Sequence, residues 1–404
     1  MMLAGSRQVW RKGRRLIRPA LFFLVWVFPS DQTDYRKIHF DAVVADTHND
    51  VAQRILAGED IGKRTTEGHS DLPRFREGGL DIEMFSIWVP PEKPRETYFE
   101  RANEQIDSLQ SLICRNPSVM GFAGNEREIR ELLHRGKFVA MFGMEGGHPL
   151  MDDMQNLEYF YRRGVRYMTL TWNNSTSWAT SASDETARPE KLKHKGLTDF
   201  GRNIVRRMNE LGMIVDVSHV GEATFWDVVK TTKKPIIASH SSVWNLCHHR
   251  RNLKDDQLKA IAKTGGVVFI NFLPGFIDST FSRKEAALRA GHKGEIDSLR
   301  SLWKGDWFNF EIAVAKTLKE EYKAIRPPLS VLIDHFDYAM KLIGPDHVGI
   351  GSDFDGIHTT PLEMDDVTFL PNITRELLRR GYSEEDVRKV LGENFLRVVR
   401  ACTP

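Results

Sequence analysis

The chain has 404 residues, of which 41% are hydrophobic and 28% are charged, and its formal net charge at pH 7 is +2. This length is long for an ordinary single domain but suits an α/β barrel with insertions. The balanced charge excludes nucleic acid as an expected partner, because nucleic-acid binding requires a concentrated basic excess. Three separated cysteines without a Cys-x-x-Cys pair argue against a disulfide framework and against a thiolate zinc site.

Residues 1–38 differ in composition from the rest of the chain and are predicted to form a leader. Basic residues between positions 11 and 18 precede the apolar run ALFFLVWVF at 20–28. This run is too short to cross a bilayer, which needs about 20 residues. A basic stretch before a short apolar run resembles an export signal, although it lacks a clear cleavage site. Two alternatives stay open: a signal or anchor segment that brings the protein to the periplasm or a membrane, and a basic leader on a cytoplasmic protein.

After the leader, short apolar runs alternate with longer amphipathic segments, which is typical of repeated βα units. Eight runs are predicted to be strands: 42–46, 81–89, 138–143, 166–171, 213–218, 235–239, 266–272 and 347–352. The segments between them are predicted to be helices: 96–114, 126–135, 157–163, 198–211, 222–231, 255–263 and 329–343. This order predicts a closed (β/α)8 TIM barrel. An open doubly wound sheet is disfavoured because its first strand usually leads into a glycine-rich phosphate turn.

Residues 39–404 are predicted to form one domain with an insertion. The highly charged segment 277–327 fits neither a strand nor a single helix. We expect a helical insertion between the seventh and eighth strands, either a lid or a solvated helical hairpin. Segments 371–379 and 383–400 predict two closing helices, with Ser383 as an N-cap.

Metal-binding residue types stand at the carboxyl ends of the predicted strands. His48 and Asp50 follow the first strand in VVADTHND, Glu145 follows the third in GMEGGH, and His219 and His240 follow the fifth and sixth in VDVSH and IIASH. In a barrel these strand ends meet on the face that carries active sites. Alternate residues of an extended chain point the same way, so the first two present an imidazole and a carboxylate side by side.

These five side chains predict a binuclear metal centre. Imidazole nitrogen and carboxylate oxygen are both good ligands for zinc. We expect His48, Asp50 and Glu145 to hold one divalent ion, and Glu145, His219 and His240 to hold a second, with Glu145 as the bridge. A hydroxide between two cations is a strong nucleophile at neutral pH, because the metals lower the pKa of bound water. Hydrolysis of an amide is the reaction that this centre predicts.

Asp353 lies near this ligand set but outside it, after the eighth strand in GIGSDFDG. We interpret it as the general base that takes the proton of the attacking water and passes it to the leaving amine. Asp355, two residues further on, is interpreted as a helix N-cap. Three more histidines, His148, His248 and His249, are expected close to the rim without a ligand role.

Several motifs together resemble the membrane (renal) dipeptidase family of binuclear zinc peptidases. They are DTHND, EGGH, YMTLTWN, GLTDFGRNIVRRMNELGMIVDVSH, ASHSS with RRN after it, and GIGSDFDG, in order over residues 40–400. The resemblance implies a (β/α)8 barrel that binds two zinc ions per chain and cleaves dipeptides, including those with a carboxyl-terminal D-residue. It also implies that the five predicted ligands and Asp353 match the family's ligands and proton-transfer aspartate.

Two further positions are assigned by this resemblance. Arg251, in HHRRN, matches the family's arginine for the substrate carboxylate, and a planar guanidinium suits that task. Where animal members have a histidine that helps to bind substrate, this chain has Trp172 in LTWNNS. Indole donates one hydrogen bond but cannot take up a proton, which puts the substrate range and rate in question but not the metals. Asn173 either supplies a compensating donor or holds a turn, and these alternatives stay open.

The sequence therefore predicts a binuclear zinc dipeptidase that holds the substrate carboxylate on Arg251. Two other classes stay open: an amidohydrolase that acts on N-acyl amino acids or another non-peptide amide, and a metal-binding protein that has lost turnover through Trp172. Family analogy also implies a homodimer.

Overall fold

Eight parallel strands close into a ring, which confirms the predicted TIM barrel. In ring order they are β1 (Ala45–Asn49), β2 (Ile82–Trp88), β4 (Phe138–Glu145), β5 (Val165–Thr169), β6 (Ile214–Asp216), β7 (Ile236–Ala238), β8 (Val267–Ile270) and β9 (Val348–Ile350). β9 pairs with β1, and β2 pairs with β4 along its whole length, so the sheet has no break. A further short strand, β3 (Met120–Phe122), was not predicted and pairs with the start of β4.

The computed structural model describes residues 34–403. Most of the predicted leader, residues 1–33 with the apolar run at 20–28, lies outside the described residues. Residues 35–38 begin a helix, α1 (Tyr35–Asp41), that opens the compact unit formed by the rest of the chain. Among the described helices, none is both long enough and apolar enough to cross a membrane.

The bounds of two strands differ from the prediction in a way that matters for the site. β1 begins at Ala45 and includes His48, which the prediction placed after the strand. β4 extends to Glu145, so that this carboxylate is carried by the last residue of the strand. Both segments are completely buried, because they point polar side chains into the barrel mouth and not into water. The hydrophobic pattern alone therefore ended these strands too early.

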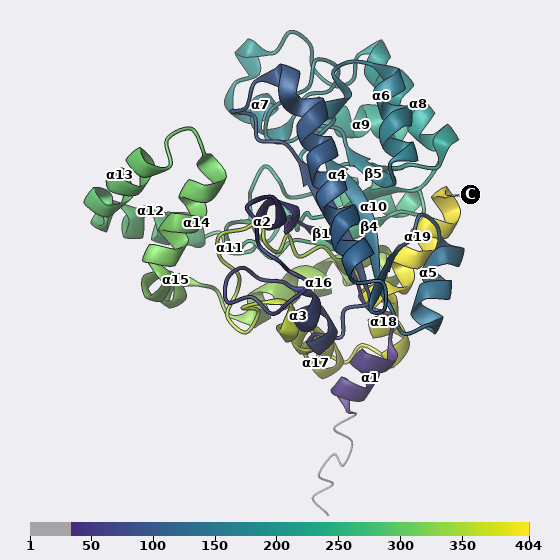
Figure 1. Cartoon of the computed structure of the whole chain (residues 1–404), viewed down its shortest axis with the longest axis vertical. Helices are drawn as coiled ribbons and strands as arrows, with labels where there is room; N and C mark the ends of the chain where they lie inside the picture. Colours follow the sequence, from purple (N-terminus) through teal and green to yellow (C-terminus); the bar gives the residue numbers. More distant parts are fainter. Residues whose placement is uncertain (1–33, 404) are drawn as a thin grey trace, which may run out of the picture. The chain divides into compact units, whose positions relative to one another are not determined.

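The predicted helices lie between the strands, within a few residues of their expected bounds (Figure 1). They are α4 (Tyr98–Arg115), α5 (Glu126–His134), α6 (Met154–Arg162), α8 (Asp199–Leu211), α9 (Glu222–Thr231), α10 (Asp255–Lys263) and α16 (Leu329–Ile343). Four helices were not predicted, because they are too short to show the hydrophobic period of a helix in the sequence. They are α2 (Ala52–Leu56), α3 (Leu72–Glu77), α7 (Ala182–Ala187) and α11 (Pro274–Ile277). Single 3₁₀ turns occupy Arg95–Thr97, His148–Leu150, Pro189–Lys191, Pro345–His347 and Val367–Phe369.

Apolar side chains fill the amino-terminal end of the barrel, and the carboxyl-terminal helix covers it. Phe395 packs edge-on against Phe269 of β8, with ring centroids 6.2 Å apart. The turn before this helix lies close to the start of the first strand. A Cβ at Gly392 would lie only 2.3 Å from the carbonyl oxygen of Val43, so the position requires glycine. The amino-terminal end of the barrel is thus closed, and any ligand must enter from the carboxyl-terminal face.

The carboxyl-terminal segment departs from its prediction in one respect. α17 (Pro371–Arg379) agrees with the expected range, but 383–400 is not a single helix. It divides into α18 (Glu384–Arg388), a π-helical turn (Lys389–Glu393) and α19 (Asn394–Cys402). Ser383 caps α18 as predicted, since its Oγ accepts a hydrogen bond of 3.1 Å from the backbone N–H of Asp386.

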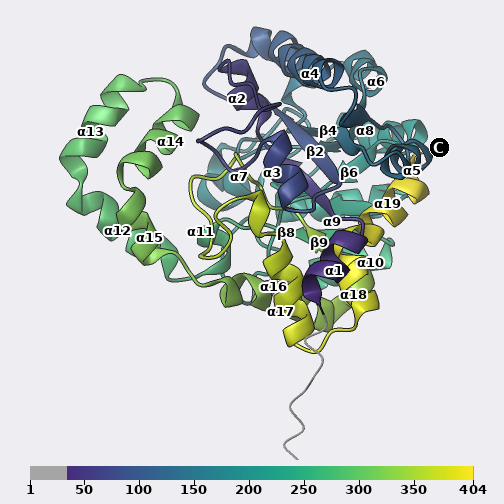
Figure 2. The same cartoon turned by 60° about the horizontal axis from the view of Figure 1, so that its bottom comes forward.

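The predicted insertion between the seventh and eighth ring strands is present and consists mainly of four helices. They are α12 (Phe281–Gly291), α13 (Lys293–Leu302), α14 (Trp307–Thr317) and α15 (Lys319–Ile325). A core of their own, which includes Phe281, Phe310 and Val314, holds them together, so the segment is more than a solvated hairpin. In both views these green helices stand beside the barrel, and α14 lies closer to it than α13 does (Figures 1 and 2).

Candidate metal centre and active site

A cavity of about 480 Å³ opens at the carboxyl-terminal face of the barrel. The ends of strands and the loops after them form its floor, and helices α12 and α14 of the insertion form part of its wall. Among the predicted site residues, those that line the cavity are Asp50, Glu145, Trp172, Asn173, His219, Arg251 and Asp353. His48 and His240 lie below this surface and are completely buried.

The five predicted ligands converge on the carboxylate of Glu145. Its Oε2 lies 3.4 Å from Nε2 of His48, which is itself 3.4 Å from Oδ2 of Asp50. Its Oε1 lies 2.8 Å from Nε2 of His219 and 3.6 Å from Nε2 of His240. Oε2 therefore faces His48, and Oε1 faces His219 and His240. The ligand atoms of His48, Glu145 and His240 all lie within 4.8 Å of one another, so the two groups adjoin.

The donor atoms at this point fit divalent cations. Within residues 34–403, Nε2 of His48 and Oδ1 of Asp50 are buried and have no hydrogen-bond partner. The Nε2 atoms of His219 and His240 lie 2.9 Å apart. Burial of unpartnered polar atoms costs free energy, so a cluster of them aimed at one point indicates a ligand. Imidazole nitrogens and carboxylate oxygens without thiolates suit zinc and similar ions.

Each of the three histidines is oriented by an acceptor at its Nδ1 atom. For His48 the acceptor is the Tyr167 hydroxyl, 2.7 Å away, which uses its own proton to bond the carbonyl of Thr47 at 3.1 Å. The Tyr167 oxygen must therefore accept, so Nδ1 of His48 carries the hydrogen. Its Nε2 atom is the one that faces Glu145 and Asp50, which is the orientation that a metal ligand requires.

The other two histidines follow the same rule. Nδ1 of His240 lies 2.8 Å from Oγ of Ser239, whose proton goes to the carboxylate of Asp216 at 2.6 Å. Nδ1 of His219 lies 3.2 Å from Oδ1 of Asn173. Asn173, for which a substrate donor or a turn was expected, thus places its amide oxygen on a candidate ligand. Both imidazoles present a free Nε2 lone pair to the centre.

The carboxylates of the cluster favour a positive charge between them. For His48 burial acts to lower the pKa, but Tyr167, Asp50 and Glu145 outweigh it, and the pKa rises well above its ordinary value. Burial lowers the pKa of His219 to about 3, and the positive charge of Arg251 adds to the effect. Burial also lowers the pKa of His240 far below its ordinary value. Both are neutral at pH 7, which is the form that binds a metal. For Glu145 burial acts to raise the pKa, but His48 and His219 outweigh it and the pKa falls below its ordinary value.

Asp353 lies beside this cluster, as expected, in a tightly built loop after β9. A carboxylate oxygen of Asp353 lies within 4.8 Å of ligand atoms of both His48 and Asp50. Its Oδ2 accepts a hydrogen bond of 2.8 Å from the amide of Asn271. Burial raises the pKa of Asp353 well above its ordinary value, and the nearby carboxylates of Asp50 and Glu145 raise it further. A carboxylate in this position has the proton affinity of a general base.

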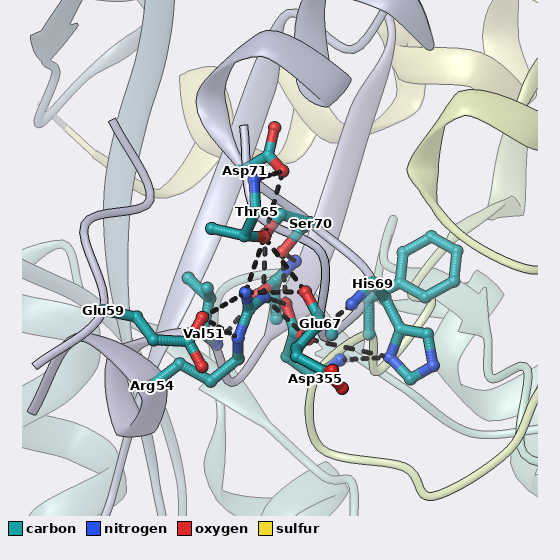
Figure 3. A network of polar contacts seen from close by, with 12 residues as sticks. Val51, Arg54, Glu59, Thr65, Glu67, His69, Ser70, Asp71 and Asp355 are labelled. Atoms are coloured by element: carbon teal, nitrogen blue, oxygen red, sulfur yellow. Dashed lines mark hydrogen bonds and ion pairs between the residues drawn. The ribbon is translucent and has the colours of Figure 1, made fainter. Parts of the chain in front are cut away.

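Asp355 does not cap a helix, so its interpretation as an N-cap was wrong. Its carboxylate accepts bonds from the backbone N–H of His69 at 2.7 Å, from the Ser70 hydroxyl, and from Nη1 of Arg54 at 3.1 and 3.2 Å (Figure 3). This buried network ties the loop after β9 to the segment after β1. It holds the backbone that carries Asp353 against the backbone that carries Asp50.

Arg251 is buried beside the cavity with unused hydrogen-bonding capacity. It is only 5% exposed, and its Nη2 lies 3.3 Å from the carbonyl oxygen of His240. Its Nε has no partner within residues 34–403. Burial lowers its pKa to about 10, which still leaves the side chain charged at pH 7. A charged guanidinium with spare donors at a cavity wall is suited to bind a carboxylate.

Several lining residues were not predicted from the sequence. His249 lines the cavity as expected, whereas His148 and His248 are not among the lining residues. The unpredicted ones include Trp88 of β2, His358 of the loop after β9, and five residues of the insertion: Glu285, Arg289, Trp307, Phe308 and Glu311. The only signal for them was the aromatic pair in GDWFNF, which carries no information on where the insertion packs.

A family model described as membrane dipeptidase (peptidase family M19) matches residues 32–403. The chain belongs to this family of metallopeptidases. Its structure is similar to the probable dipeptidase PvdM from Pseudomonas aeruginosa, with 26% identity, a TM-score of 0.75, and coverage of 91% of this chain and 97% of that one. The predicted family and the class of metallo-dipeptidase are therefore confirmed.

Two other solved structures are similar over nearly the same range. A dipeptidase AC, described as a metallopeptidase, is 26% identical with a TM-score of 0.72, and the match covers 89% of this chain and 98% of that one. A metallopeptidase from Rhodobacter sphaeroides, solved with a phosphinate mimic of the dipeptide L-Ala-D-Ala, is 25% identical with a TM-score of 0.72. That match covers 89% of this chain and 99% of the other.

Proposed function

We propose that this metallo-dipeptidase uses two zinc ions and cleaves dipeptides, including those with a carboxyl-terminal D-residue. The observation that carries the proposal is the Glu145 carboxylate, whose two oxygens face separate donor groups. His48 and Asp50 would share one ion with Glu145, and His219 and His240 would share the other. When bound, such ions lower the pKa of water and polarise a carbonyl, which supplies a nucleophile at neutral pH.

Proton transfer and substrate binding are assigned to side chains of the protein. Asp353 would take a proton from the attacking water, because its carboxylate is next to the cluster and its pKa is raised by burial. It would then deliver this proton to the nitrogen of the leaving amine. Arg251 would hold the substrate carboxylate, which fixes the scissile bond over Glu145. The cavity volume of about 480 Å³ lies near the lower end of the range for small-molecule sites and suits a substrate of two residues.

An assay with several substrate classes tests this function. Zinc-loaded protein would be incubated with L,L- and L,D-dipeptides, N-acyl amino acids and aminopurines. We expect hydrolysis of dipeptides of both series. Turnover of N-acyl amino acids alone would instead assign the chain to a different class of amidohydrolase. Full zinc occupancy without turnover would assign it to a binding protein, and either result would reject the proposal.

If Arg251 binds the substrate carboxylate, its replacement should lower kcat/KM only for substrates that carry this carboxylate. In Arg251→Ala, kcat/KM for dipeptides should fall roughly 10²-fold, because a buried charge no longer pairs with the carboxylate. A dipeptide amide has no such carboxylate and serves as the control substrate. The wild-type protein should discriminate strongly against the amide, and the variant should not. Equal losses on both substrates would mean that Arg251 does not bind the carboxylate.

The orientation of His48 predicts a change in metal affinity. Tyr167→Phe removes the acceptor for Nδ1–H of His48 and should weaken zinc binding roughly 10- to 100-fold. Competition with a chromophoric chelator would measure this. Tyr382→Phe is the matched control, since its hydroxyl bonds Asp337 at 2.8 Å, away from the cavity residues. Unchanged zinc affinity in Tyr167→Phe would refute the orienting role.

A further inference from the structure

Four aromatic rings gather on one wall of the cavity and come from two separate parts of the fold. Trp88 ends β2, Trp172 follows β5, and Trp307 and Phe308 begin α14 of the insertion. The Trp88 ring lies 5.0 Å from that of Trp172 and 5.9 Å from that of Phe308, and Trp172 lies 6.0 Å from Trp307. All four line the cavity. The barrel and the insertion thus build one continuous aromatic wall.

The part of this wall formed by Trp88 lies across the barrel mouth from Arg251. Trp88 is directly opposite Glu145 in the pairing of β2 with β4, and the ring of Trp172 lies 6.2 Å from that of His219. Arg251 belongs to the loop after β7 and contacts the carbonyl of His240. In the ring of eight strands β7 is the fourth from β2 in either direction, so it stands opposite it. The wall therefore begins beside Glu145 at Trp88 and continues at Trp172 toward His219.

The charged groups that the insertion contributes to this cavity are already paired. Arg289 bonds Glu311, with Nη1 at 3.2 Å from Oε1. Glu285 accepts bonds from the Tyr322 hydroxyl at 2.8 Å and from Nε2 of His358 at 2.9 Å. These pairs leave neither insertion carboxylate free to attract a cationic side chain. What the wall offers is aromatic surface, which binds apolar and aromatic groups by dispersion and ring packing.

We propose that this aromatic wall binds the side chain of the amino-terminal residue of the dipeptide and selects large apolar side chains. The inference rests on the proposed function, since it takes Arg251 as the anchor for the carboxylate. With the carboxylate there and the scissile amide over Glu145, the amino-terminal residue extends toward the opposite side. Trp172 then adds apolar surface to the side of the cavity that receives this side chain.

A series of X-Ala dipeptides with X as Ala, Leu, Phe, Trp and Lys tests this. In the wild-type protein, kcat/KM should rise from Ala-Ala to Phe-Ala by at least roughly 10- to 200-fold, the discrimination that a single methylene group can give in an apolar pocket. Trp307→Ala and Trp307→Ala/Phe308→Ala should reduce this ratio by at least about tenfold. Trp307 is 43% exposed, so its truncation leaves the insertion folded, which a thermal melt would verify.

Trp303→Ala is the matched control. Trp303 lies in the same insertion, is 37% exposed and is not among the lining residues, so the Phe-Ala to Ala-Ala ratio should stay at its wild-type value. A wild-type ratio close to one, a preference for Lys-Ala, or an unchanged ratio in the double variant would overturn the inference while dipeptide hydrolysis stands. Absence of hydrolysis for every dipeptide would overturn the proposed function and this inference with it.

Discussion

Glu145→Gln is expected to abolish dipeptide hydrolysis and to reduce the zinc content of the protein. The amide keeps the shape of the side chain but loses the charge and one of the two acceptor oxygens that face the donor groups. Since each cation contributes several kcal/mol to the transition state, kcat/KM should fall by more than ~10³-fold. Elemental analysis of dialysed protein and a dipeptide assay would measure the two effects together.

Glu83→Gln is the matched control for this variant. Glu83 lies on the neighbouring strand β2, is as deeply buried, and accepts a hydrogen bond from Asn49 at 3.2 Å. Burial raises the pKa of Glu83 well above its ordinary value, which favours the neutral carboxyl, and an amide resembles that form. Zinc content should stay at the wild-type level. A Glu145→Gln protein that keeps full zinc content and activity would refute the bridging role.

Asp353→Asn is expected to lower kcat by ~10²- to 10⁴-fold, the usual contribution of a general base, while zinc stays bound. Because the pKa of Asp353 is raised, the wild-type carboxylate becomes protonated as the pH falls through that raised value and can no longer accept a proton. Wild-type kcat/KM should therefore decrease toward acid pH. The residual activity of the variant should lack this decrease. A pH profile of both proteins would measure it.

Asp355→Asn separates proton transfer from the stability of the same loop. This substitution leaves the buried guanidinium of Arg54 with weaker partners, so the melting temperature should fall. The decrease of kcat/KM toward acid pH should persist, because Asp353 is still present. If Asp353→Asn retained the wild-type pH profile and rate, Asp353 would not be the base.

The barrel and the candidate ligands were predictable because both depend on short segments. Each strand is recognisable in the sequence as an apolar run. In a parallel barrel the carboxyl ends of all strands lie on the same face, independently of the loop conformations. His48, Glu145, His219 and His240 therefore meet although they are far apart in the sequence. Asp353 was interpreted as the base from its place after the eighth strand, and the family resemblance then assigned Arg251. Both residues line the cavity.

The parts that the sequence did not reveal depend on packing between distant segments. The acceptors that orient the histidines, Tyr167 and Ser239, sit in ordinary strand patterns, and nothing in their neighbours marks them. The aromatic wall requires knowing that α14 packs beside β2 and β5. β1 was placed too early because Thr47, His48 and Asn49 are polar yet completely buried, which reverses the usual pattern.

Anomalous diffraction at the zinc edge from crystals of the zinc-loaded protein tests the central claim most directly. The account predicts two peaks that flank Glu145, one in contact with His48 and Asp50 and the other with His219 and His240, each bound by one oxygen of the Glu145 carboxylate. A single peak, or two peaks of which Glu145 contacts at most one, would contradict it.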